Sequence, residues 1–315
     1  MPAVNGILLI DKPDGMTSAA VVQAVKHRLG EEKVGHLGTL DPFATGLLPV
    51  CLGTGTKISQ FLMVERKAYS GTIRLGVETD TFDSTGMVIK TSPIPPTDEA
   101  TLRKLEAQFT GEQWQTPPMY SAIKRKGVPL YKLARQGLEV DREPRKVTIE
   151  QLTLTSVSND TLSFSLGCSK GTYVRSLAVD LGTSLGCGAH LATLRRTEFG
   201  PFSIDQALPL FLLATRWEQR TLPVLSLEQA LRHYRAVEIT ERIAIMLRQG
   251  RQEALREIAQ KATTDEIVQL LGQNGELVAM VQFQGEWKLL RVFSTLQSGG
   301  GVLRGTEEPN IKEKE

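Results

Sequence analysis

Alternation of apolar and polar side chains over residues 69–77 constrains the fold of this chain more than any other feature. The apolar parity holds Tyr69, Ile73, Leu75 and Val77, and the polar parity holds Ser70, Thr72 and Arg74. Because successive side chains of a strand point to opposite faces, this pattern predicts a strand with one apolar face. Residues 162–168 alternate in the same way and predict a second such strand.

Helical patterns and turns separate these strands. Apolar side chains recur on one stripe over residues 19–29 and 173–185, which predicts two helices. A third helix is expected to begin at Thr97 as its N-cap. Gly6–Asp11 predicts a short buried strand, and the glycine and proline content from Gly35 to Gly55 predicts a loop.

The C-terminal part of the chain predicts a small β-rich module. Prolines and a mixed apolar sequence indicate a change of domain between residues 205 and 235. A helix is expected over 239–249, and Asn274-Gly275 predicts a hairpin within a set of three strands. The tail after Ser298 is glycine-rich and then charged, which is typical of disorder.

Composition disfavours several classes of protein and site. The 315 residues allow one large domain or two unequal ones, and neither a signal peptide nor a membrane span is evident. The three cysteines show no C-x-x-C spacing and the four histidines are scattered, which disfavours a disulfide framework and a metal site. Reduced thiols favour a cytoplasmic protein.

Positive charge is concentrated in residues 118–146, although the net charge of the chain is only +2. Eight lysines and arginines there outnumber three acidic residues, which gives the segment a net charge of +5. A phosphate-binding surface needs such a cluster, and a solvated loop with a chance excess of lysines is an equally open alternative.

Asp41 and Arg175 depart from local expectations. Asp41 is a lone carboxylate in a largely apolar loop, and Pro42 favours an extended backbone there. Arg175 falls in the first turn of an expected helix, where its charge meets the positive end of the helix dipole. Such departures mark functional sites, but an ordinary Asp-Pro turn and a solvated arginine are the simpler alternatives.

Several segments carry motifs whose order and spacing hold over residues 6–200. They are Asp11–Ser18, Gly35–Gly46, Lys67–Tyr69, Pro117–Lys124, Gly171–Leu177 and Leu194-Arg195-Arg196. Together they resemble the motifs of the bacterial TruB family of tRNA pseudouridine(55) synthases. A chance match of the whole set is negligible.

The resemblance implies an α+β fold of pseudouridine-synthase type, in which helices flank a mixed, mainly antiparallel sheet. It implies a catalytic domain at residues 1–232 with a basic RNA-gripping insertion at 118–146. A small β-rich PUA-like RNA-binding domain is implied at 233–298, followed by a disordered tail at 299–315. The implied activity converts uridine 55 in the T loop of tRNA to pseudouridine by base flipping, without a cofactor.

The same motifs imply site residues. Asp41 is implied as the nucleophile and Arg175 as its cationic partner. Tyr69 is implied to stack on the target base and is a candidate for removing a sugar proton. The residues implied to contact the flipped nucleotide or fill its place are His36, Tyr69, Tyr173 and Leu194. The residues expected to grip RNA are Lys57, Lys124, Arg125, Lys126 and Lys132. No metal is implied. The expected protein is a monomer that binds the T arm, with its C-terminal domain towards the acceptor end.

Two other functions stay open on the residues alone. An RNA chaperone would use the same basic segment but would have no need of Asp41. A carboxylate-dependent nucleoside glycosidase would need a second catalytic acid. Asp80 and Asp83 are the candidates for that acid, although both also fit a turn before Gly86.

Overall fold

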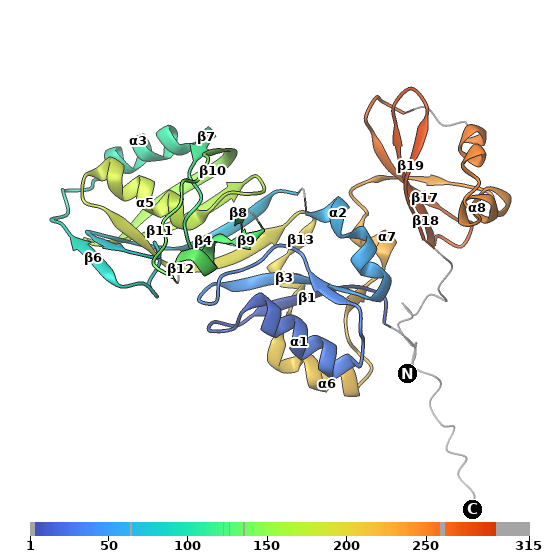
Figure 1. Cartoon of the computed structure of the whole chain (residues 1–315), viewed down its shortest axis with the longest axis horizontal. Helices are drawn as coiled ribbons and strands as arrows, with labels where there is room; N and C mark the ends of the chain where they lie inside the picture. The colour runs from blue at the N-terminus through green and yellow to red at the C-terminus, as the bar shows by residue number, and fades with distance from the viewer. Residues whose placement is uncertain are drawn as a thin grey trace, which may run out of the picture.

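The computed structural model describes residues 4–63, 65–121, 123–125, 127–134, 136–258 and 262–293. A long sheet with helices above and below it forms the larger body, and a second sheet with one longer helix stands beside it (Figure 1). Among the described residues, none of the helices combines the length and the hydropathy that a bilayer crossing requires.

A mixed, mainly antiparallel sheet forms the centre of the larger body. In the described ranges its order is β14-β1-β3-β12-β4-β11-β10-β7, with β2, β13 and β15 paired to β3, β12 and β1. Within those ranges the parallel pairs are β1–β14 and β3–β12. The strands are β1 (Gly6–Lys12), β2 (Val34–His36), β3 (Thr45–Leu52), β4 (Lys67–Leu75), β7 (Gly111–Gln115), β10 (Arg145–Ser158), β11 (Thr161–Cys168), β12 (Ala189–Phe199), β13 (Phe202–Ser203), β14 (Leu208–Pro209) and β15 (Val224–Leu225). The predicted α+β fold class is confirmed.

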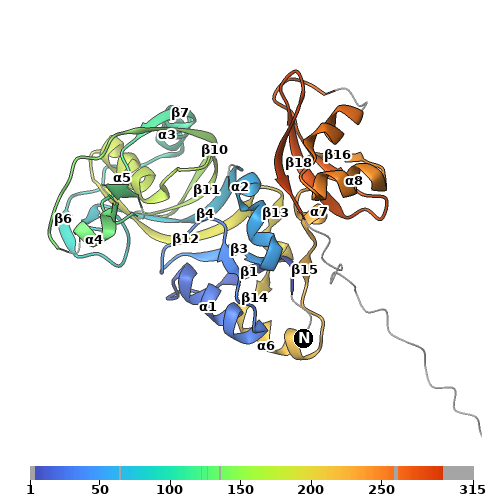
Figure 2. The same ribbon diagram turned by 45° about the vertical axis from the view of Figure 1, so that its right-hand side comes forward.

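Helices cover both sides of this sheet. In two views α3 and α5 lie over β10 and β11, while α1 and α6 lie beneath β1 and β3 (Figures 1 and 2). The α-helices of the larger body are α1 (Ser18–Leu29), α2 (Ser59–Leu62), α3 (Glu99–Phe109), α4 (Leu130–Ala134), α5 (Val174–Leu185), α6 (Leu213–Glu218) and α7 (Leu227–Ala230), and α8 (Glu241–Arg248) lies in the second body. Two short hairpins complete the body, formed by β5 (Val77–Thr79) with β6 (Val88–Thr91) and by β8 (Lys124–Arg125) with β9 (Val128–Pro129).

The alternating segments form neighbouring strands of the sheet, as their patterns predict. β4 and β11 are paired antiparallel, with Tyr69 opposite Leu166. Their apolar faces belong to one buried cluster with α5. β4 ends at Leu75, because Gly76 adopts a left-handed φ of 77° and turns the chain.

The start of α3 corrects a prediction. The N-cap is Asp98, whose carboxylate accepts a hydrogen bond from the Thr101 N–H at 2.8 Å. Thr97, the predicted cap, instead donates its hydroxyl to the Pro95 carbonyl at 3.0 Å. Two adjacent residues could cap this helix, and the carboxylate is the better acceptor.

The expected loop from Gly35 to Gly55 is also corrected, because it contains β3. Pro49 lies inside this strand, where a proline is unusual. On one side β3 pairs with β12 up to Gly46 and with β2 from Val50 onward. Pro49 lies between these two pairings, and its carbonyl still accepts a hydrogen bond from the Leu37 N–H at 2.9 Å.

The second body is built on the sheet β16 (Arg235–Glu238), β17 (Ile267–Leu271), β18 (Leu277–Phe283) and β19 (Trp287–Val292). The predicted hairpin joins β17 and β18, with Gly275 at a φ of 75°. β16 was not predicted, and it adds a fourth strand parallel to β17. Met280 and Phe293 share an apolar cluster with Ile7 and Phe61, so the two bodies pack together. The predicted tail at 299–315 lies outside the described residues.

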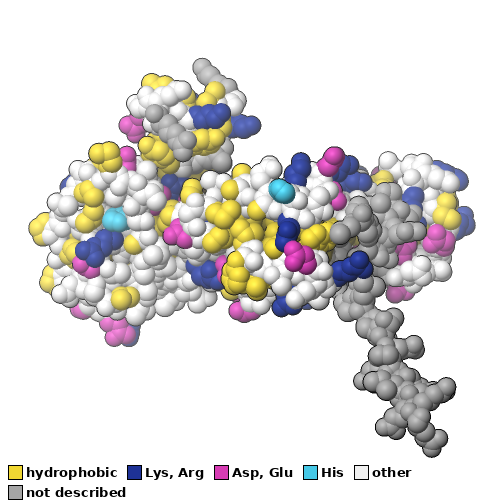
Figure 3. All heavy atoms as spheres, turned by 90° about the horizontal axis from the view of Figure 1, so that it is seen from below, with side chains coloured by type: hydrophobic (Ala, Val, Ile, Leu, Met, Phe, Trp, Pro, Cys, Tyr) yellow, Lys and Arg dark blue, Asp and Glu magenta, His cyan; other side chains and the backbone are white. Residues whose placement is uncertain are grey.

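Figure 3 shows the molecule from below, with hydrophobic side chains gathered near its middle. On this side α1 and α6 form a groove whose lining includes Ala24, Leu210 and the 79% exposed Phe211. An ion pair of 2.6 Å between Arg28 and Glu218 joins the two helices. They therefore form one layer beneath the sheet.

Candidate active site

The loop that carries Asp41 is held by the end of β1 and the start of α1. The Ser18 hydroxyl donates to the Leu40 carbonyl at 3.0 Å and accepts from the Leu40 N–H at 2.8 Å. The Lys12 ammonium donates to the Pro42 carbonyl at 3.0 Å. The residues on both sides of Asp41 are thus fixed by an element that is distant in sequence.

Arg175 contacts both carboxylate oxygens of Asp41. Its Nε lies 2.9 Å from Oδ2, and its Nη2 donates to Oδ1 at 3.1 Å. The Arg175 side chain is 4% exposed, whereas that of Asp41 is 33% exposed. The guanidinium is therefore buried behind a carboxylate that still reaches the surface of the site.

Further acceptors around Arg175 explain why a cation can lie in the first turn of α5. Its Nη2 donates to the Tyr120 carbonyl at 2.7 Å, and its Nη1 donates to the Thr81 carbonyl at 3.1 Å. Asp83 lies on another side, with Oδ2 3.7 Å from Nη1. Two carboxylates and two carbonyls outweigh the unfavourable helix dipole.

The pKa of Asp41 is raised above its ordinary value. Burial is the largest cause, and the charge of Asp83 adds to it, while Arg175 and Lys12 act in the opposite direction. Both oxygens of Asp41 accept hydrogen bonds from a group that can only donate. That arrangement fits the ionised carboxylate.

Tyr69 lies on β4 directly opposite Arg196 of β12. The two side chains therefore lie on the same face of the sheet. Burial raises the pKa of the Tyr69 hydroxyl, while the charge of Arg196 opposes this rise and the charge of Asp41 adds to it.

His36, Tyr173 and Leu194 are the other residues implied to contact the nucleotide or fill its place, and they lie on different elements. Burial lowers the pKa of His36 on β2, and its Nδ1 has no hydrogen-bond partner among the described residues. Tyr173 is the N-cap residue of α5, and Asp41 and Arg175 both act on its hydroxyl through their charges. Leu194 is buried on β12 in the cluster that contains Tyr69.

Three buried residues of this region were not singled out as site residues from the sequence. Lys12 is fully buried and donates to the Pro13, Met16 and Pro42 carbonyls, and burial lowers its pKa to about 8. Gln115 exchanges two hydrogen bonds with the backbone of Tyr173, at 3.0 and 2.7 Å. Arg196 is the third. Lys12 and Arg196 lay within motifs, but no local pattern indicated that they are buried.

Asp80 and Asp83, the two candidates for a second catalytic acid, are both bonded within their own turn. Oδ1 of Asp83 accepts from the Thr81 and Thr85 hydroxyls and from the Thr85 N–H, and the residue is 4% exposed. Asp80 accepts from the Met87 N–H and forms the turn. In the described ranges no group of three His, Cys, Asp or Glu side chains is placed to hold a metal ion.

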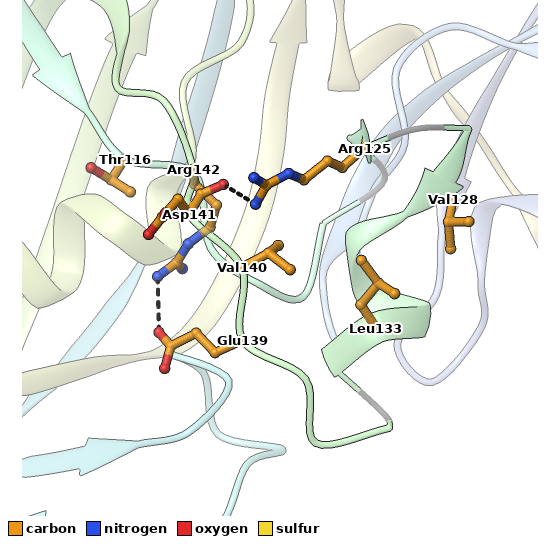
Figure 4. A pocket seen from close by; sticks show the side chains of 8 residues that line it. All are labelled: Thr116, Arg125, Val128, Leu133, Glu139, Val140, Asp141 and Arg142. Carbon is orange, nitrogen blue, oxygen red and sulfur yellow. Dashed lines mark hydrogen bonds and ion pairs between the residues drawn. The ribbon is translucent and has the colours of Figure 1, made fainter.

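The basic segment forms a cavity of about 860 Å³ beside the sheet (Figure 4). Arg125 donates to the Asp141 carbonyl and Arg142 pairs with Glu139, so these two arginines are bonded within the segment. Lys124 and Lys132 are exposed on β8 and α4. Lys57 is half-buried in the turn after β3, and Lys126 lies outside the described residues.

Family models match most of the chain. Residues 26–174 match the TruB family pseudouridylate synthase (N terminal domain), and residues 175–233 match the tRNA pseudouridylate synthase B C-terminal domain. The matched ranges contain the Asp41 loop, β4, the basic segment, α5 and β12.

Curated proteins and a solved structure are similar over most of their length. The tRNA pseudouridine synthase B of Aromatoleum aromaticum is 50% identical over 79% of this chain and 80% of its own. That of Syntrophotalea carbinolica is 44% identical over 92% of this chain and 98% of its own. A chain in the crystal structure of a Cbf5-Nop10-Gar1 complex superimposes with a TM-score of 0.73 at 27% identity, over 92% of this chain and 85% of that chain.

Proposed function

The chain belongs to the TruB family of pseudouridylate synthases, and from this premise we propose that it converts uridine 55 in the T loop of tRNA to pseudouridine without a cofactor. Pseudouridylation of tRNA is the activity of the curated relatives. The contact that carries the proposal is the pair of hydrogen bonds between Asp41 and Arg175. It gives the site an ionised carboxylate that still reaches the surface, where a nucleoside would approach it.

Asp41 is the proposed nucleophile. Breaking an N-glycosidic bond develops positive charge at the sugar carbon, and a carboxylate can attack that carbon or stabilise the charge. Attack at C6 of the uracil and elimination to a glycal are the other routes open to the same group. Arg175 keeps the carboxylate charged in a partly desolvated place and aims it.

The target uridine is stacked in the folded T loop, so it must be flipped out at a cost of a few kcal/mol. Tyr69 is the proposed stacking partner of the flipped base and a candidate acceptor for the sugar proton. Tyr173 and Leu194 line the proposed uracil pocket. His36 helps to fill the space that the base leaves in the RNA.

RNA binding is assigned to two regions. The insertion at 118–146 contacts phosphates of the stem. The residues proposed for these contacts are Lys124, Arg125, Lys126 and Lys132, together with Lys57 from outside the insertion. The proposed catalytic domain ends at residue 232, and residues 233–298 form a PUA-like domain that reaches towards the acceptor end. The proposed protein acts as a monomer in the cytoplasm, where its tRNA substrate is found.

The test uses the full chain and two unmodified RNAs, a tRNA transcript and its isolated T-arm hairpin. Base-specific chemical mapping should find one new pseudouridine, at position 55, in both RNAs. A hairpin with cytidine at that position is the matched control and should stay unmodified. Modification at another position would contradict the proposed target, and absence of any pseudouridine would contradict the activity.

A further inference from the structure

Arg196 is the largest fully buried side chain of the described residues, and the proposed mechanism does not use it. It is 1% exposed and lies on β12, where it follows Leu194 and Arg195 in the sequence. Burial of a guanidinium is costly, so each of its donors must find an acceptor. The identity of these acceptors indicates what the residue does.

Backbone carbonyls fix the guanidinium of Arg196. Its Nε donates to the Leu47 carbonyl at 2.8 Å, and its Nη2 donates to the Gly38 carbonyl at 3.0 Å. The Phe199 ring lies on it, with 5.2 Å between the ring centroid and Cζ. Gly38 has a φ of 67°, and a Cβ there would lie 3.0 Å from that ring, so a side chain at 38 would crowd the arrangement.

Tyr69 faces Arg196 across the β4–β12 pair, so its phenol lies on the same face of the sheet as the guanidinium. Arg175 and Arg195 are paired with carboxylates, at 2.9 Å from Asp41 and 2.7 Å from Asp11. Within the described residues Arg196 instead donates to the two backbone carbonyls and forms no ion pair with an acid. Its charge is therefore left to act on Tyr69.

We propose that Arg196 is a positioning residue for Tyr69: its fixed guanidinium holds the tyrosine hydroxyl and thereby sets the plane of the ring that receives the flipped base. The inference rests on the proposed roles of Asp41 and Tyr69. Because a guanidinium only donates, the Tyr69 oxygen accepts from Arg196 and the hydroxyl hydrogen points elsewhere. The nearby positive charge also favours negative charge on that oxygen.

The experiment is a double-mutant cycle on the full chain, with the unmodified T-arm hairpin as substrate. Single-turnover rates of pseudouridine formation and Kd values for the hairpin are measured for wild type, Arg196→Lys, Tyr69→Phe and the double variant. Lysine keeps the charge but cannot bond two carbonyls and the phenol in one plane. Arg195→Lys, in the half-exposed ion pair with Asp11, is the matched control and should leave the rate within about twofold.

Arg196→Lys should slow the reaction by about 100-fold and leave Kd within about threefold, as a small misplacement at a reacting centre does. In the Tyr69→Phe background the same change should slow it by less than about threefold, because the hydroxyl that Arg196 holds is gone. An equal slowing in both backgrounds would overturn the inference, since Arg196 would then act through the loop or the fold. A Tyr69→Phe rate equal to that of wild type would also overturn it.

Two additions keep the test decisive. If Arg196→Lys does not fold, Phe199→Leu loosens the guanidinium without removing it, and its smaller effect should likewise vanish with Tyr69→Phe. Asp41→Asn is measured in parallel. An active Asp41→Asn variant would contradict the proposed function, whereas an inactive one with additive Arg196 and Tyr69 effects would contradict this inference alone.

Discussion

Two buried arginines, twenty-one positions apart, have opposite surroundings. Arg175, at the start of α5, lies between the carboxylates of Asp41 and Asp83. Arg196, inside β12, bonds two carbonyl oxygens and lies opposite Tyr69. Both are at most 4% exposed. The same side chain thus meets two acids in one region and neutral partners in the other.

From this difference we infer which of the two regions can change its charge during a reaction. Around Arg175, negative charge can move from Asp41 to another atom while the guanidinium stays compensated by Asp83. Around Arg196 no acid of the described residues shares the charge, so its hydrogen bonds set geometry. We therefore expect variants of the first region to change rate and pH dependence, and variants of the second to change rate alone.

Replacing Arg175 should have the largest effect. Arg175→Lys removes the paired contact with both Asp41 oxygens and the bonds to the Tyr120 and Thr81 carbonyls. Loss of preorganised donors at a reacting centre costs about 10²–10³ in rate, and we expect that factor in single-turnover assays. Circular dichroism and thermal unfolding check the fold. A folded variant whose single-turnover rate is within tenfold of the wild-type rate would contradict the role assigned to the Arg175 region.

The pH dependence of the rate should separate the two regions next. In the proposed mechanism only the ionised form of Asp41 is active. Because burial raises the pKa of Asp41, the rate should fall on the acid side at a higher pH than an ordinary aspartate gives. Asp83 contributes to that rise. Asp83→Asn should therefore move the acid limb to lower pH.

Arg196→Lys is the control for this shift, because its charge is kept and Asp41 is not among its partners. Its acid limb should match that of wild type at a reduced rate. Rates of all three proteins are measured with saturating hairpin from pH 4 upwards, over the range in which each stays folded. If the acid limb of Asp83→Asn lies at the same pH as that of wild type, the electrostatic account of the Arg175 region is contradicted.

Exposed lysines should show the smallest effect on chemistry. Lys124 and Lys132 lie on the surface of the basic segment, so water solvates their ammonium groups in the free protein. Their proposed contacts with phosphates form only when RNA binds. Lys124→Ala with Lys132→Ala should weaken hairpin binding and lower the salt dependence of log Kd by about 1 per contact. The single-turnover rate at saturating RNA should stay unchanged. A slower rate at unchanged Kd would place these lysines in the chemistry.

Local patterns predicted the elements whose signals are local. The alternation in β4 and β11 and the stripe of α5 depend on neighbours in sequence, and the structure has all three within two residues of the predicted ends. β16 was missed, because Arg235–Glu238 is a strand only through its pairing with β17. β3 was missed, because Gly46 and Pro49 favour a loop locally and the strand forms through its pairing with β1.

The candidate site followed the same rule. Motifs pointed to Asp41, Tyr69 and Arg175 as candidates. The contact between Asp41 and Arg175 could not be predicted locally, because the two residues are more than a hundred positions apart. Asp83 was weighed only as a turn residue or a glycosidase acid, since its approach to Arg175 depends on where the β5–β6 hairpin packs. Arg196 is buried by β3, β4 and β12 and by the loop at Gly38, which are distant from one another in sequence. No local pattern could therefore predict its burial.

The most direct test of the whole account removes the Asp41 carboxylate. Asp41→Ala and wild type are incubated with the same unmodified tRNA transcript, pseudouridine at position 55 is quantified, and Kd is measured in parallel. The account predicts no detectable pseudouridine with the variant and a Kd within about threefold of wild type, because the acid serves chemistry and faces an anionic ligand. Pseudouridine formation by Asp41→Ala at the wild-type rate would contradict it.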